Sequence, residues 1–91
     1  MITLTLSLLN IDYQPSTMQK TYKILINKEL EGQYTANVPT LPGCITFGES
    51  IEDAIEMAKE AIELYIEELN ERGEDVPDDN QTIEYSLNIA V

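Results

Sequence analysis

Ninety-one residues suffice for one small domain and exclude two. Seventeen acidic residues against five basic residues give a formal net charge of −12, which disfavours nucleic-acid binding by this chain alone and favours a basic protein partner. A hydrophobic content of 43% excludes a disordered acidic tail, and the absence of histidine excludes Ser-His and Cys-His nucleophile pairs and histidine-containing zinc sites.

Residues 1–17 form an N-terminal extension, ahead of the domain expected over residues 18–91. Their apolar side chains alternate with Thr and Ser, which is typical of a strand: Ile2, Leu4, Leu6 and Leu8. Because Met18-Gln19-Lys20 also resembles a natural protein start, the extension is either an edge or exchanged strand or an artefact of an upstream start. No segment has the roughly 18 consecutive apolar residues of a membrane span, and we expect neither a signal peptide nor a membrane helix.

Two strands joined by a hairpin are expected over residues 22–27 and 34–38. In both segments apolar and polar residues alternate with the period of two that half-buried strands show. Residues 29–32 between them are polar and end in Gly32, which favours the positive φ of a tight turn. After two prolines, residues 44–47 can form a short third strand.

A long amphipathic helix is expected from about Ile51 to Arg72. Ser50 and Asp53 match the S-x-x-[DE] capping pattern, which satisfies backbone N–H groups at a helix start, and Gly73 is a typical helix stop. Apolar residues recur at spacings of three and four and form one stripe on a helix of about 3.6 residues per turn: Ile51, Ala54, Ile55, Ala58, Ile62, Tyr65 and Leu69.

A final strand is expected over residues 82–91. Its apolar residues alternate with polar or small ones over the whole segment: Ile83, Tyr85, Leu87, Ile89 and Val91. The fold class is therefore α+β, a small β-β-β-α-β domain in which the last strand lies parallel to an earlier one, preferably the first. One helix covers only one face of such a sheet, so we expect a homo-oligomer, a dimer or a tetramer, to bury the remaining face and edges.

The net negative charge lies entirely in the second half of the chain. Residues 1–48 contain three acids and three bases, whereas residues 49–84 contain fourteen acids and two bases. Helix glutamates lie opposite the apolar stripe, and five of them are candidate contacts for a basic partner: Glu52, Glu56, Glu60, Glu63 and Glu67. The alternative interpretation is that these glutamates are only the solvent-exposed face that most amphipathic helices have. The shortage of interleaved Lys or Arg favours the partner-binding role.

One stretch of the chain combines several motifs in a fixed order. Residues 34–50 read YTANVPTLPGCITFGES and continue as IEDA, so a strand ending in Val-Pro, a Leu-Pro-Gly-Cys turn, a serine cap and an acidic helix start follow one another. This combination resembles the HicB-like antitoxin family, over about residues 22–91. The resemblance implies a partial RNase H-like fold and an antitoxin that binds and masks a small, basic, RNA-cleaving toxin of the HicA type.

Two residues and the end of the sequence depart from the family pattern. Thr40 stands where the family often has an acidic residue, and Gln33 stands where a glycine is common. The sequence stops at Val91, after the last expected strand, whereas many members continue into a DNA-binding module, so we expect a short form that does not bind nucleic acid by itself.

An orphan oligomeric module that binds another protein remains an alternative. A metal-dependent nuclease is a weaker one, because the first two expected strands lack carboxylates for Mg²⁺. We expect no catalysis, cofactor or metal.

Residues 41–44, Leu-Pro-Gly-Cys, allow a structural and a functional interpretation. Leu41 and Cys44 can pack against the helix beside a Pro-Gly turn. Alternatively, a rigid loop that exposes Leu41 and Pro42 docks a partner, which makes these two residues candidate contacts. Because no neighbouring residue supplies a base or lowers the thiol pKa, Cys44 is better interpreted as a buried apolar side chain than as a nucleophile. A single cysteine also fits a reducing cytoplasm.

Overall fold

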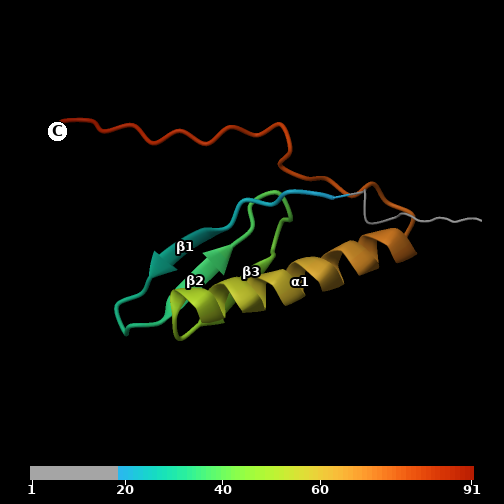
Figure 1. Cartoon of the computed structure of the whole chain (residues 1–91), viewed down its shortest axis with the longest axis horizontal. Coiled ribbons are helices and arrows are strands. Elements are labelled where there is room, and N and C mark those ends of the chain that lie inside the picture. Colours follow the sequence, from blue (N-terminus) through green and yellow to red (C-terminus); the bar gives the residue numbers. More distant parts are fainter. Residues whose placement is uncertain (1–18) are drawn as a thin grey trace, which may run out of the picture.

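The computed structural model describes residues 19–91, so the strand expected within residues 1–17 lies outside the described residues. Figure 1 shows three short strands followed by one long helix: β1 (Leu25–Lys28), β2 (Tyr34–Asn37), β3 (Ile45–Gly48) and α1 (Ile51–Glu71). The α+β class and the β-β-β-α order are confirmed.

The three strands form an antiparallel meander in the order β1-β2-β3. Ala36 in the central strand lies opposite Ile26 of β1 and Thr46 of β3. Gly32 lies in the hairpin between β1 and β2, and its φ of 90° is the left-handed conformation predicted for this turn. The expected pairing of the first two strands is therefore confirmed.

The first strand begins at Leu25, three residues later than the alternation predicts. The N–H of Lys23 donates to Asp79 Oδ2 at 2.8 Å, and the carbonyl of Thr21 accepts from the Asp79 N–H at 2.7 Å. These backbone groups therefore bind the segment that follows α1.

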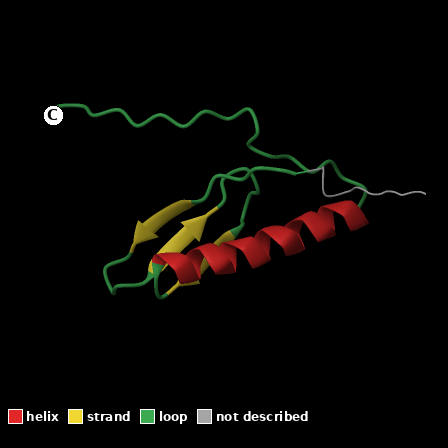
Figure 2. Ribbon diagram, viewed as in Figure 1, coloured by secondary structure: helices red, strands yellow, loops and turns green. Residues whose placement is uncertain are grey.

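Helix α1 lies along one face of the sheet (Figure 2). A core of mostly small side chains joins the two layers: Ala36, Val38, Leu41, Cys44, Ala54 and Ala58. Gly48 is part of this close approach, because a Cβ there would lie 2.3 Å from the Ala54 nitrogen. The other face of the sheet exposes Leu25, Ile45 and Phe47, whose side chains alternate with the core-facing ones.

Both ends of α1 agree with the expectation to within one residue. Ser50 Oγ accepts from the N–H of Asp53 at 3.0 Å, and Asp53 Oδ2 accepts from the N–H of Glu49 at 3.0 Å, so the helix start is capped twice. Gly73 has a φ of 71°, the left-handed conformation that ends many helices. No helix among residues 19–91 combines the length with the apolar character that crossing a membrane requires.

The last expected strand is the main correction to the prediction. Residues 82–91, called the C-terminal arm below, are exposed and pair with no strand among the described residues. Figure 1 shows the arm leading away from the sheet and helix. The N–H of Thr82 donates to the Asp79 carbonyl at 3.0 Å, and this turn ends the contact with the segment that precedes β1. Alternation alone does not make a strand, because its backbone groups need a neighbouring strand to pair with.

Candidate functional site

The helix glutamates selected from the sequence form one continuous row on α1, called the acidic stripe below. It consists of Glu52, Glu56, Glu60, Glu63 and Glu67. Spacings of three and four residues place all five within an arc of about 80° on the helix surface, and each of the five is exposed. The buried Ala54 and Ala58 lie on the opposite side of α1, so the stripe faces away from the sheet.

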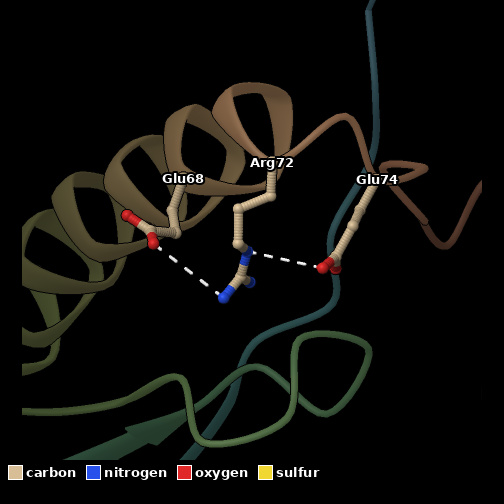
Figure 3. A network of polar contacts seen from close by, with 3 residues as sticks. All are labelled: Glu68, Arg72 and Glu74. Carbon is tan, nitrogen blue, oxygen red and sulfur yellow. Dashed lines mark ion pairs between the residues drawn. The ribbon is translucent and has the colours of Figure 1, made fainter.

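The acidic stripe takes part in neither of the ion pairs that residues 19–91 form. Both pairs are made by Arg72, whose Nη1 lies 3.9 Å from Glu68 Oε2 and whose Nε lies 3.4 Å from Glu74 Oε2 (Figure 3). These pairs are solvent-exposed at the C-terminal end of α1 and contribute little to stability. The carboxylates of the stripe are therefore available to a cationic partner.

The like charges within the stripe repel one another. Three pairs of its residues stand four positions apart, each pair with like charges. Each such pair costs an exposed helix about 0.2–0.5 kcal/mol, and more at low than at high salt. A helix selected only for stability and solubility would interleave Lys or Arg with its glutamates. The arrangement therefore favours a role in binding.

The Leu-Pro-Gly-Cys turn is built into the core, which corrects one candidate contact. Leu41 has no exposed surface, and its N–H donates to the Val38 carbonyl at 3.0 Å. Leu41 is therefore a packing residue and not a surface contact. Pro42 is exposed, and its carbonyl accepts from the Tyr65 hydroxyl at 2.8 Å. Because Tyr65 packs against the core, the structure does not bring Pro42 together with the acidic stripe.

Cys44 is buried, as expected for an apolar thiol in the core. Burial raises the pKa of the Cys44 thiol above its ordinary value, which disfavours the thiolate that a nucleophile needs. The N–H of Cys44 donates to the Leu41 carbonyl at 2.9 Å, and its carbonyl accepts from the Val38 N–H at 3.0 Å. The residue therefore holds the turn against the core.

Asp79 is the polar residue that the sequence patterns miss. It is buried, and its carboxylate accepts from the Lys23 N–H, at 2.8 Å, and from the Thr40 hydroxyl. These donors, the Lys23 N–H foremost, hold the pKa of the Asp79 carboxyl below its ordinary value. A hydroxyl at position 40 suits this contact, whereas a second carboxylate would repel Asp79. The partners are distant in sequence, so no local spacing reveals the contact.

Comparisons with known proteins give consistent matches. The family model described as HicB_like antitoxin of bacterial toxin-antitoxin system matches residues 22–89. A UPF0150 protein of Thermoplasma acidophilum is 46% identical over 59 residues, which cover 65% of this chain and 86% of that protein. A UPF0150 protein of Synechocystis is 48% identical over 56 residues, which cover 62% of this chain and 71% of that protein. The crystal structure of the N-terminal domain of Burkholderia pseudomallei antitoxin HicB is similar, with a TM-score of 0.57 and 35% identity, covering 75% of this chain and 72% of that chain.

Proposed function

Since the chain belongs to the HicB_like antitoxin family, we propose that it neutralises a small, basic, RNA-cleaving toxin of the HicA type by binding it and masking its RNA-contacting surface. The acidic stripe carries this proposal. A row of exposed carboxylates on a helix creates a negative potential similar to that of a phosphate backbone. Such a row attracts an RNA-binding surface, accelerates the encounter, and loses strength as salt rises.

The distribution of acids supports masking rather than catalysis. β1, β2 and β3 contain no Asp or Glu, and the helix acids of the stripe face away from the sheet. A two-metal nuclease needs carboxylates that converge on one point. The chain therefore acts on RNA cleavage by occupying the toxin. Pro42, exposed at a separate place, is a secondary candidate contact.

The remaining expectations extend the same proposal. The chain acts in the cytoplasm as a homo-oligomer and does not contact nucleic acid by itself. Its net charge of −12 supports the absence of nucleic-acid contact. The exposed Leu25, Ile45 and Phe47 on the uncovered sheet face, together with the exposed C-terminal arm, support self-association.

The direct test starts from the genes beside this one: a small, strongly basic, histidine-containing protein encoded there is tested for binding to this chain. We expect the two proteins to co-purify at low salt, the affinity to fall as salt rises, and RNA cleavage by the basic protein to stop when this chain is added. Failure to bind at low salt would contradict the proposal. Binding without any effect on RNA cleavage would favour an orphan binding module.

A matched pair of charge reversals isolates the stripe. Glu56→Lys with Glu60→Lys changes the charge on the stripe, and Glu31→Lys with Asp75→Lys changes the net charge equally at exposed positions outside it. We expect the first variant to lose about tenfold or more in association rate at low salt and the second to lose far less. Equal losses in the two variants would assign the effect to net charge. An unchanged association rate in both would show that the stripe is only a solvent-exposed face without a role in binding.

A further inference from the structure

The C-terminal arm has one apolar side and one polar side. Successive residues of an extended segment point in opposite directions, so the odd-numbered side chains share one side. These are largely exposed: Ile83 91%, Tyr85 81%, Leu87 67% and Ile89 67%. The even-numbered side chains are polar or small. A row of large apolar side chains of this length is typical of a strand whose neighbour is missing.

The body of the domain offers a matching edge and groove. In the described sheet β1 is an edge strand, so the backbone groups on its outer side are unpaired. Beside the segment that leads into β1, an open groove of about 550 Å³ runs along one flank of α1. Its apolar lining consists of Tyr22, Ile24, Ile55, Ile62 and Ile66. A strand paired with β1 would place one row of side chains on the side of the sheet where this groove lies.

The chain reaches the segment that precedes β1 but does not continue along β1 itself. The N–H of Asp79 donates to the Thr21 carbonyl at 2.7 Å, as a neighbouring strand would. The turn closed by the Thr82 N–H and the Asp79 carbonyl then redirects the chain, and Asn80 is held there by Asp78 through two hydrogen bonds of 3.2 and 2.7 Å. The arm therefore leaves the body immediately beside the edge that it matches.

We propose that two copies of this chain exchange their C-terminal arms. Residues 83–91 of each copy pair with the open edge of β1 in the other, and the apolar side of the arm covers the groove along α1. The exchange is reciprocal, as in a two-fold symmetric dimer, and it supplies each domain with its fourth strand from the other copy. The proposal does not depend on toxin binding.

Charge supports a second copy over a basic partner as the occupant of the groove. Two copies that each carry a net charge of −12 repel one another unless the surfaces that meet are poor in acids. The arm contains one charged side chain, Glu84, and the charged residues that line the groove are Lys20, Lys59 and Glu63, two bases against one acid. A basic partner is attracted to the acidic stripe instead, which shares only Glu63 with the lining of the groove.

The test compares molar masses in solution for the full chain without any toxin. We expect the unchanged chain to have the mass of two or four copies. Leu87→Asp with Ile89→Asp alters the apolar side of the arm and is expected to lower the mass at least twofold. Ser86→Asp with Asn88→Asp adds the same charge on the polar side and is expected to keep the mass. A monomeric unchanged chain, or equal masses for both variants, would overturn the proposal.

A mixing experiment separates exchange from an arm that folds back onto its own chain. The arm variant is combined with a groove variant, Ile55→Asp, whose side chain is already 42% exposed and whose helix content is checked by circular dichroism. With exchange, the intact arm of the groove variant pairs with the intact groove of the arm variant, and a mixed dimer forms that neither variant forms alone. No mixed dimer is expected if each arm folds back, and that result would overturn the proposal.

Discussion

The two sides of α1 differ in what their side chains do. On one side, Ala54 and Ala58 are fully buried and small enough for the helix to approach the sheet closely. On the other, the acidic stripe is exposed, forms no ion pair among residues 19–91 and places like charges four residues apart. Packing is therefore carried by one side of the 21-residue helix, and the proposed function assigns partner binding to the other. Substitutions on the two sides should separate these properties.

The largest effect is expected where the sheet and the buried side of α1 come closest. Gly48→Ala places a Cβ against the Ala54 backbone and should destabilise the domain by about 3 kcal/mol. Gly32→Ala is the matched control, because its Cβ meets no atom within 4 Å and only the φ of 90° is unfavourable. It should cost about 1 kcal/mol. Urea unfolding of both variants measures the difference, and equal costs would contradict the close approach.

Asp79 is an exception to the contrast between packing residues and exposed acids, because it is an acidic residue that stabilises the fold. Its folded pKa lies below the ordinary value, so the stabilisation is present above an unfolded pKa of about 3.9 and is lost as pH falls through the folded pKa. Asp79→Asn should therefore lower the melting temperature at neutral pH, and the two melting curves should converge in acid. A constant difference between pH 7 and pH 3 would exclude the charged carboxylate as the cause.

The helix start contributes a smaller amount. Ser50→Ala removes the acceptor for the Asp53 N–H and should cost about 1 kcal/mol. Ser86→Ala, in the exposed arm, removes the same hydroxyl without a cap and should leave the free energy of unfolding unchanged. The two variants are compared by chemical denaturation. A similar loss in both would show that the cap does not stabilise α1.

The smallest expected change in the free energy of unfolding is a stabilisation. Replacing Glu56, Glu60, Glu63 and Glu67 by Gln removes the like-charge pairs and should stabilise the domain by about 0.5–1 kcal/mol at low salt. The gain should shrink as salt screens the original repulsion. Thermal unfolding at two salt concentrations measures it. A destabilised variant would show that the stripe has contacts that its exposure does not reveal.

Features that depend on neighbouring residues could be predicted from the sequence. The bounds of α1, its serine cap and the glycine in the hairpin follow from spacing over a few residues. Features that depend on distant contacts could not. The Asp79 carboxylate contacts Thr40, which is 39 positions away in the sequence, and Lys23, which is 56 positions away. The burial of Leu41 depends on where α1 lies, and the alternation in the C-terminal arm does not tell which strand it pairs with, or in which molecule.

The single buried thiol makes the opening of this small core measurable. Cys44 is the one cysteine of the chain and is 4% exposed, so a thiol reagent reaches it only when the turn at residues 41–44 separates from the helix. The labelling rate, followed by mass spectrometry, therefore reports how often this contact breaks under native conditions. The same rate, measured with and without a bound partner, shows whether binding at the exposed side of α1 reduces how often the turn separates from its buried side.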